Sequence, residues 1–337
     1  MDYRYYSHHV INSQMAMTDI EQTVGELLSG QPPNLPVSKY DIMRKKAGES
    51  RPAIMNENLT IIVAAVIFND NGQVVMVQEA KPGCRRKWYL PAGRVNPNET
   101  LEEAVKREVL EESGLMFKPT TIIYIDTSLI WGYWVRVTYT GYITGGHMKT
   151  LAEADEESLQ AKWCSLEEIK SHEMFTLRGE DIVPIISTAF QFFNNSPATR
   201  HAPILPTQHP HKHMCMRIVL IKQRQNNLEV LVCTEDVPHL PVIKDSVMYN
   251  DSIWRLDKDA FKSSNIYLSC GVIAVEHCGR PHGVADGVCI NFLVTTDTNR
   301  ELVNKKYSWF PICNPELDML LRQRLCKTMN VPYVCHS

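Results

Sequence analysis

The chain has 337 residues, enough for two ordinary domains, and its hydrophobic content of 44% excludes a disordered protein. Its 35 basic and 38 acidic residues give a net charge of −3, which argues against nucleic-acid binding. The ten cysteines are scattered and form no C-x-x-C pair, which predicts reduced thiols in a cytoplasmic or nuclear protein. The N-terminus shows no apolar signal segment, and no stretch has transmembrane length, so we expect no membrane partner.

Residues 1–55 are polar and contain several prolines, so we expect an N-terminal extension outside the folded domains. One short helix is expected from Thr18 to Gly30, because Thr18 and Glu21 have the spacing of a capping box and Gly30 can end a helix. We interpret the extension as a mobile tail, with a docking arm as the alternative.

Residues 56–195 have the alternating pattern of a mixed α/β domain. The expected order is strands at 60–68 and 73–78 joined by a turn at 69–72, a helix from 100, strands near 121–127 and 133–143, a short strand opening at 163, and helices near 166–172 and 180–193. Sheet and helices in this order predict an α/β/α sandwich.

The helix expected from Thr100 carries a dense set of charged residues. Thr100 and Glu103 form a capping box, and Gly114 is suited to end the helix in a left-handed conformation. The acidic residues at the spacing i, i+3 and i+4 project from one face; they are Glu108, Glu111 and Glu112. Carboxylates held this close repel one another unless a hard divalent cation binds between them, although a solvated acidic face is the alternative for such a triplet alone.

The whole run from Gly93 to Leu115 matches the pattern G-x5-E-x7-R-E-U-x-E-E-x-G-U, in which U is aliphatic. This pattern resembles the box of Nudix hydrolases, which cleave nucleoside diphosphate derivatives with Mg²⁺ or Mn²⁺. The resemblance implies metal ligands at the carbonyl of Ala92 and at Glu108, Glu111 and Glu112. It also implies that Arg107 orients the glutamates, that Glu99 supports them, and that Glu157 supplies a further ligand or a general base.

Several short segments resemble one Nudix subfamily more closely, the one that removes phosphate from 8-oxoguanine nucleoside diphosphates. They are Gln78–Lys81, Trp88–Arg94, Glu153–Asp155 and Glu157–Ala161. The substrate-binding residues that we expect on this basis are Val74, Gln78, Tyr89 and Asp155. Trp131 and Trp134 are further candidates for stacking on the base, although a core position is the stronger interpretation for Trp134. A basic run, Lys81 with Arg85–Lys87, either attracts phosphate or only solvates a loop.

Residues 196–213 are rich in proline, asparagine and histidine and are expected to be a linker. Its alternating His209, His211 and His213 are interpreted as solvated side chains rather than metal ligands, because no cysteine or carboxylate stands at a ligand spacing.

Residues 214–337 repeat the order of elements in the first domain. The short run His239–Val242 is similar to Tyr89–Ala92, and Tyr307–Pro311 is similar to Ala161–Ser165. The helix expected near 251–262 offers Asp257 and Asp259 but no box. We therefore predict a degenerate Nudix-like α/β domain without a metal site, with an unrelated α/β domain as the alternative.

The function predicted from these resemblances is metal-dependent hydrolysis of oxidised purine nucleoside diphosphates, such as 8-oxo-dGDP and 8-oxo-GDP, to the monophosphate and phosphate. The expected partner is a small-molecule nucleotide. Two alternatives stay open: a Nudix hydrolase for another substrate such as ADP-ribose, and a Nudix-fold binding or scaffold protein. A fragment of about residues 50–197 contains every proposed catalytic residue. If the second domain is only a scaffold, we expect this fragment to retain turnover, with lower stability because a domain interface is exposed.

Overall fold

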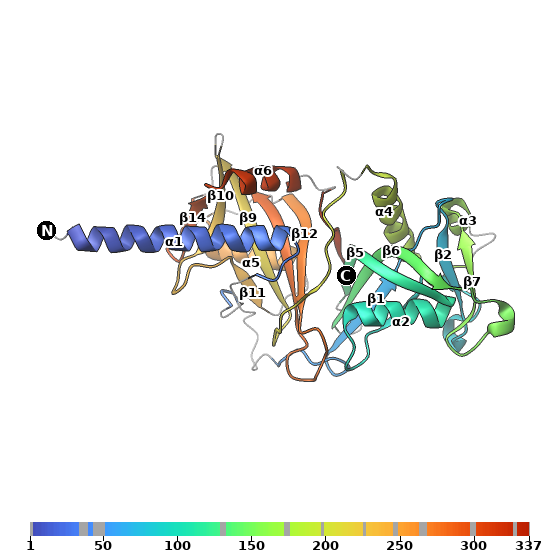
Figure 1. The fold of residues 1–337 in the computed structure, drawn as a ribbon. Helices are drawn as coiled ribbons and strands as arrows, with labels where there is room; N and C mark the ends of the chain where they lie inside the picture. The colour runs from blue at the N-terminus through green and yellow to red at the C-terminus, as the bar shows by residue number, and fades with distance from the viewer. Residues whose placement is uncertain are drawn as a thin grey trace. The chain divides into compact units, whose positions relative to one another are not determined.

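The computed structural model describes residues 3–33, 40–42, 51–128, 133–171, 176–196, 199–224, 227–244, 249–262, 268–296, 301–325 and 329–336. The chain forms two compact units, each assembled from segments far apart in the sequence (Figure 1). The box unit, named for the Gly93–Leu115 pattern, comprises Ile54–Leu205, Gly279–Gly283 and Val331–Ser337. The repeat unit comprises Met1–Ala53, Pro206–Cys278 and Val284–Asn330. Among the described residues, no helix is both long and apolar enough to cross a membrane.

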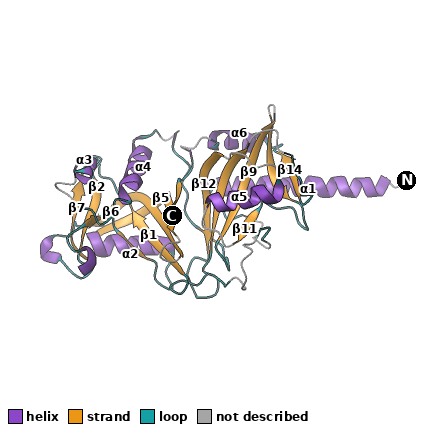
Figure 2. Cartoon of the chain, turned by 180° about the vertical axis from the view of Figure 1, so that it is seen from behind, coloured by secondary structure: helices purple, strands orange, loops and turns teal. Residues whose placement is uncertain are grey.

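The box unit is a mixed α/β structure. In chain order its elements are β1 (Leu59–Ala65), β2 (Val74–Glu79), β3 (Trp88–Tyr89), β4 (Ala92–Arg94), α2 (Leu101–Ser113), β5 (Leu115–Ser128), β6 (Tyr133–Gly146), β7 (Ser158–Cys164), α3 (Leu166–Lys170), α4 (Ile182–Asn194) and β15 (Tyr333–His336). A five-stranded sheet has the order β15-β5-β6-β1-β4, and a second sheet has the order β3-β2-β7. Helices α2 and α4 lie on opposite sides of β5 and β6 (Figures 1 and 2), which confirms the predicted sandwich.

Most elements of the box unit were predictable from local pattern, although several strand boundaries were wrong. The turn at residues 69–72 forms as expected, because Asn69 Oδ1 accepts backbone N–H bonds from Asn71 and Gln73 and Gly72 has a φ of +72°. Strand β5 begins directly after the helix, six residues before the predicted start. Trp163 stands near the end of β7 rather than opening it, because β7 pairs with β2 along its whole length.

The repeat unit contains the remaining elements. They are α1 (Tyr3–Leu28), β8 (Thr207–Gln208), β9 (Cys215–Arg224), β10 (Asn227–Cys233), β11 (Val242–Lys244), α5 (Tyr249–Ala260), β12 (Leu268–His277), β13 (Val288–Thr296), β14 (Tyr307–Pro311) and α6 (Pro315–Arg324). Its sheet has the order β14-β10-β9-β13-β12-β8, with β11 paired to β9.

The strand pairings of the repeat unit follow those of the box unit. Strand β1 pairs antiparallel with β4 and parallel with β6, as β9 pairs with β11 and β13. The bulged antiparallel pair β5–β6 corresponds to β12–β13. The Ala65 N–H bond to Pro91 O matches that of Ile218 to Pro241 O, which aligns Tyr89–Ala92 with His239–Val242. The repeat unit is therefore a further sheet domain whose strand pairings parallel those of the box unit.

A short parallel strand completes the edge of each sheet, and the two units exchange these strands. Strand β8 follows α4 of the box unit in sequence but pairs with β12 of the repeat unit. Strand β15 follows α6 of the repeat unit but pairs with β5 of the box unit. Sequence order alone placed β8 in the expected linker and would assign β15 to the repeat unit.

The interpretation of the N-terminal segment as a mobile tail was wrong for its described portion. Helix α1 runs from Tyr3 to Leu28 and passes through Thr18, so the predicted capping box does not start it. Its side chains Ile20, Val24 and Leu27 are almost completely buried in the core of the repeat unit. The helix persists because burial of this apolar stripe stabilises it more than local propensity would.

The histidines of the predicted linker were also misjudged. His211 and His213 are buried and His209 is half-buried, because the pairing of β8 with β12 draws this segment onto the sheet. His211 Nε2 lies 3.0 Å from Glu276 Oε2, a carboxylate 65 residues away in the sequence. The expectation of solvated side chains failed because the strand pairing is non-local.

Candidate active site

Helix α2 begins and ends where the sequence predicts. The Glu103 N–H donates to Thr100 Oγ1 at 3.1 Å, and the Thr100 N–H donates to Glu103 Oε2 at 2.7 Å. Gly114 ends the helix with a φ of +75° and donates its N–H to Leu110 O. The apolar face is formed by the buried side chains of Leu101, Ala104, Val105 and Val109. Burial of this face sets the rotation of the helix about its axis.

That rotation turns two glutamates inward and one outward. Glu108 and Glu112 are buried, with 6% and 2% of their surface exposed, whereas Glu111 is exposed. The Ala92 N–H donates to Glu112 Oε2 at 2.9 Å, so the loop before β4 touches the helix at this carboxylate. A Cβ on Gly93 would lie 2.1 Å from Glu108 Oε1, so only glycine permits this approach. The structure therefore brings the box glycine and the box glutamates together.

Arg107 connects the carboxylates of this cluster. Its Nε and Nη2 donate to Glu99 at 2.9 and 2.6 Å, and its Nη1 donates to Glu108 Oε1 at 2.7 Å and to Glu111 Oε2 at 3.0 Å. Nη2 also donates to the carbonyl of Arg94 at 3.0 Å. A planar guanidinium with several fixed donors holds these oxygens in defined directions. Arg107 therefore joins the carboxylates of Glu99, Glu108 and Glu111.

The cluster has the electrostatic character of a cation site. Burial raises the pKa of Glu112 to about 8, and the neighbouring Glu108 carboxylate adds to the effect. Burial also raises the pKa of Glu108, although Arg107 opposes the shift. Carboxylates gathered at a desolvated site favour protonation unless a cation compensates their charge. The possible ligands are all oxygen atoms: the glutamate carboxylates of α2 and the carbonyl of Ala92, the residue before Gly93. Such a set fits a hard divalent metal ion.

One carboxylate near this site was missed by the sequence analysis as a functional candidate. Glu79 is 3% exposed and its charge interacts with that of Glu112. Its Oε1 accepts a bond from Arg178 Nη1 at 2.7 Å, while its buried Oε2 has no hydrogen-bond partner among the described residues. Its position in Gln78–Lys81 was the available signal, but strand periodicity does not show that β2 ends beside α2. Lys81, two residues after Glu79, forms an ion pair with Glu157 at 3.2 Å, so Glu157 lies near the end of β2.

Tyr89 belongs to a buried polar network. Its hydroxyl donates to Asp181 Oδ2 at 2.7 Å and accepts a bond from Arg136. Arg136 also bonds Asp126 through Nε at 2.9 Å and Nη2 at 2.5 Å. Burial raises the pKa of Tyr89, so the hydroxyl stays protonated. The guanidinium of Arg178 lies 4.9 Å from the centre of the Tyr89 ring.

The other expected substrate contacts have diverse surroundings. Gln78 Oε1 accepts from Gln160 Nε2 at 2.9 Å, and its amide donates to Arg86 O at 3.0 Å. Asp155 accepts backbone N–H bonds from Glu157 and Ser158 and pairs with Lys149 at 2.6 Å. Val74 is fully buried in the core, which gives no support to a substrate contact. Trp134 stacks on His336 with ring centres 5.9 Å apart, and Trp131 lies outside the described residues.

The repeat unit has a different charge pattern at the corresponding place. The bond from Val303 N–H to Ala260 O matches that from Lys149 to Ser113, which aligns Asp259 with Glu112 and Arg255 with Glu108. Asp259 Oδ2 accepts from Tyr307 at 2.8 Å and pairs with Lys306 Nζ at 2.7 Å. Arg255 therefore stands where the box unit has Glu108, and Lys306 pairs with the residue that corresponds to Glu112.

Comparison with known proteins agrees with the geometry. The NUDIX domain model matches residues 58–184. The human protein named 8-oxo-dGDP phosphatase NUDT18 is 32% identical over 335 residues, which cover 94% of this chain and 99% of that protein. The Danio rerio protein of the same name is 33% identical over 84% of this chain and 90% of that protein. A Caenorhabditis elegans protein named putative nudix hydrolase 1 is 33% identical over 55% of this chain and 51% of that protein. Because the similarity extends along nearly the whole chain and includes the complete box, this protein belongs to the Nudix hydrolase family.

Proposed function

We propose that this protein hydrolyses oxidised purine nucleoside diphosphates, with 8-oxo-dGDP as the preferred substrate, to the nucleoside monophosphate and orthophosphate. The observation that carries the proposal is the carboxylate cluster of α2, in contact with the Ala92–Gly93 loop within a box unit. The choice of substrate is supported by the name of the human and zebrafish relatives, which are similar along most of their length. The free cysteines support our further proposal of a reducing compartment such as the cytosol.

We assign the metal ligands to Glu108, Glu111, Glu112 and the carbonyl of Ala92, with Mg²⁺ as the expected ion and Mn²⁺ as a substitute. When bound, the ion neutralises phosphate charge and lowers the pKa of water. Arg107 holds the glutamates in place, and Ala92 fixes the direction of Glu112 through its N–H. Water attacks the β-phosphorus, and the bond to the bridging oxygen breaks. Glu111 and Glu157 are our two candidates for the base that takes the proton from water, because both are well exposed.

Recognition of the oxidised base rests on a changed hydrogen-bonding pattern. An 8-oxo purine carries an N7–H donor where guanine has an acceptor. A buried acceptor in the site would discriminate by roughly 1–3 kcal/mol, the cost of leaving a polar group unpaired. This corresponds to about 5- to 150-fold in kcat/KM. Tyr89, Gln78 and Asp155 are the residues that we propose for substrate contact.

The test is a competition assay with purified protein and Mg²⁺ at limiting concentrations of 8-oxo-dGDP, dGDP, 8-oxo-dGTP and ADP-ribose. We expect kcat/KM for 8-oxo-dGDP to exceed that for dGDP by at least about tenfold. We also expect 8-oxo-dGTP to be a poor substrate, because the site must accommodate a third phosphate. Equal rates for 8-oxo-dGDP and dGDP, or a preference for ADP-ribose, would contradict the proposed substrate and leave the Nudix assignment intact.

A further inference from the structure

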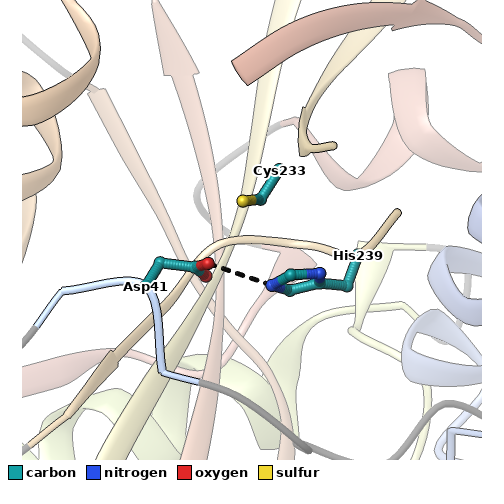
Figure 3. Close-up of side chains that lie close together, drawn as sticks. All are labelled: Asp41, Cys233 and His239. Atoms are coloured by element: carbon teal, nitrogen blue, oxygen red, sulfur yellow. Dashed lines mark hydrogen bonds and ion pairs between the residues drawn. The ribbon is translucent and has the colours of Figure 1, made fainter. Parts of the chain in front are cut away.

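Three metal-ligating side chains converge in the repeat unit, in a part of it that the proposed function does not use. They are Asp41, Cys233 and His239, and their ligand atoms all lie within 4.8 Å of one another (Figure 3). They come from separate segments: the described residues 40–42, the end of β10 and the connection between β10 and β11. Figure 3 shows the carboxylate of Asp41 and the imidazole of His239 facing each other, with the sulfur of Cys233 beside them.

The hydrogen bonds of His239 define which ring nitrogen carries the proton. Nδ1 lies 2.7 Å from the carbonyl oxygen of Val237, which can only accept, so Nδ1 is the donor. In the neutral ring Nε2 then presents a lone pair, and it lies 3.0 Å from Asp41 Oδ1, which is also an acceptor. Two acceptors at this distance repel each other. Either the ring is protonated or a cation binds between the two atoms.

The surroundings of Asp41 are arranged in the way that supports a metal ligand. Its Oδ2 accepts the Val242 N–H at 2.8 Å, which fixes the direction of the carboxylate. A histidine ring held by a backbone carbonyl and a carboxylate held by a backbone N–H are the usual outer contacts of metal ligands. The side chain of Asp41 is only 1% exposed and that of His239 is 20% exposed, so one side of the cluster remains open to solvent.

The sulfur of Cys233 adds a third possible ligand atom, within 4.8 Å of those of Asp41 and His239. Cys233 is fully buried, so solvent does not compete for its sulfur. In the absence of a metal ion the thiol of Cys233 forms a hydrogen bond with the Asp41 carboxylate. A borderline-soft metal ion would bind thiolate, imidazole and carboxylate together. A thiolate and a carboxylate also neutralise a divalent charge. Lys306, the nearby cation, has its charge paired with Asp259 at 2.7 Å.

We propose that Asp41, Cys233 and His239 bind one Zn²⁺ ion, with water as the fourth ligand. Tetrahedral zinc places such ligand atoms roughly 3.3–3.8 Å apart, so small side-chain movements suffice. The ion fastens residues 40–42 to β11, where the Asp41 N–H already donates to Val242 O at 3.0 Å. The proposed hydrolysis uses none of these three residues. In the box unit the pair corresponding to Cys233 and His239 is Val77 and Tyr89, which offers no such ligand set.

A second cluster, His209, His211 and Glu276, is less suited to a metal ion. Glu276 Oε1 is already bonded by the Arg217 guanidinium and by Asn291 Nδ2, the latter at 2.9 Å. A buried guanidinium in contact with the carboxylate neutralises it and repels a further cation. The Asp41 cluster has no such charge on its carboxylate oxygens among the described contacts.

Cobalt spectroscopy on the reduced full-length protein tests the proposal. Co²⁺ replaces Zn²⁺ in tetrahedral sites, and a thiolate ligand gives a sulfur-to-cobalt charge-transfer band. The Nudix carboxylates contain no sulfur, so they cannot produce this band. We expect the band to saturate at one equivalent of Co²⁺ and to disappear when Zn²⁺ is added. A titration without the band, which an Asp41–His239 ion pair alone would give, overturns the proposal.

Variants identify the ligands. Cys233→Ser should abolish the band, while Cys270→Ser, a buried cysteine of the same unit outside the cluster, should retain it. Asp41→Asn and His239→Gln should keep sulfur ligation but weaken Zn²⁺ binding at least about tenfold, measured by competition with a chromophoric chelator. If Cys233→Ser fails to fold, the proposal is tested by the band of the wild-type protein and by the Zn²⁺ affinities of Asp41→Asn and His239→Gln. A band that persists in Cys233→Ser, or wild-type affinity in both other variants, contradicts the site.

Discussion

His336 in β15 bonds through Nε2 to Oδ2 of Asp126 at 2.8 Å, although 210 residues separate the two in sequence. Asp126 is fully buried and is also bonded by Arg136. The edge strand β15 therefore covers a buried ion pair that reaches Tyr89 through Arg136. This contact makes the last strand of the chain part of the box unit.

Deleting residues 331–337 should destabilise the box unit, because it exposes an edge of the sheet and removes one partner of the buried Asp126. We expect a loss of at least about 2 kcal/mol in the free energy of unfolding. Urea unfolding followed by tryptophan fluorescence measures it, with deletion of Ser337 alone as the control. An unchanged urea midpoint would show that β15 contributes nothing to the unit.

The same reasoning revises the expectation that residues 50–197 retain turnover. That fragment lacks β15 and also Arg280, whose Nη2 donates to Glu103 at 2.6 Å. We expect it to be poorly folded by circular dichroism, and we expect addition of residues 331–337 through a flexible linker to improve its folding. A fragment of 50–197 with full helicity and wild-type kcat would refute this revision.

Glu112→Gln should lower kcat by on the order of 10²-fold or more, because it keeps the size of the side chain but removes a ligand charge. Steady-state kinetics in Mg²⁺ measures the effect. Glu102→Gln, on the same helix and outside the carboxylate cluster, is the matched control and should retain turnover. Near-wild-type turnover in Glu112→Gln would remove this residue from the site.

Gly93→Ala should reduce kcat about 10- to 100-fold while the protein stays folded, because the new methyl group displaces the Glu108 carboxylate. Gly83→Ala provides the comparison, since a Cβ at Gly83 meets no atom within 4 Å. Kinetics and circular dichroism on both variants separate loss of geometry from loss of folding. Equal activity in the two variants would mean that the loop does not need to approach Glu108.

The stability of the metal-free protein should fall as pH rises. Burial raises the pKa of Glu112 to about 8 in the folded state, above its ordinary value near 4.5. The folded state therefore holds this proton more tightly, and the resulting stability is complete below about pH 4.5 and is lost as pH rises to about 8. Urea unfolding in EDTA across this range should show the decline, and Glu112→Gln should flatten it. If Glu112 instead made the free energy of unfolding rise with pH, the prediction would be contradicted.

Tyr89→Phe should lower the free energy of unfolding by roughly 1–3 kcal/mol, because Asp181 and Arg136 each lose a hydrogen bond to the buried hydroxyl. Urea unfolding measures the loss, and Tyr124→Phe in the same core is the control. A raised KM with unchanged stability would instead indicate that the hydroxyl serves the substrate and not the network.

The sequence by itself determined the parts of this protein that depend on neighbouring residues. The capping box at Thr100, the apolar stripe of α2 and the end at Gly114 place Glu108, Glu111 and Glu112 on one face whatever surrounds the helix. The similarity of His239–Val242 to Tyr89–Ala92 likewise revealed the repeat before any strand pairing was known. Spacing of 3.6 residues per turn and cap chemistry are local properties, and they can be read directly from the chain.

The tertiary structure alone decided which distant segments meet. It put β15 in the box unit and β8 in the repeat unit, buried α1 in a core, brought Glu79 near Glu112 and set Asp41 against His239. These contacts join residues far apart in the sequence, such as Asp126 and His336, which are 210 positions apart, and no local period records them. They form because burying apolar surface and pairing sheet edges stabilise the chain globally, so the partner of a strand or a charge depends on the whole fold.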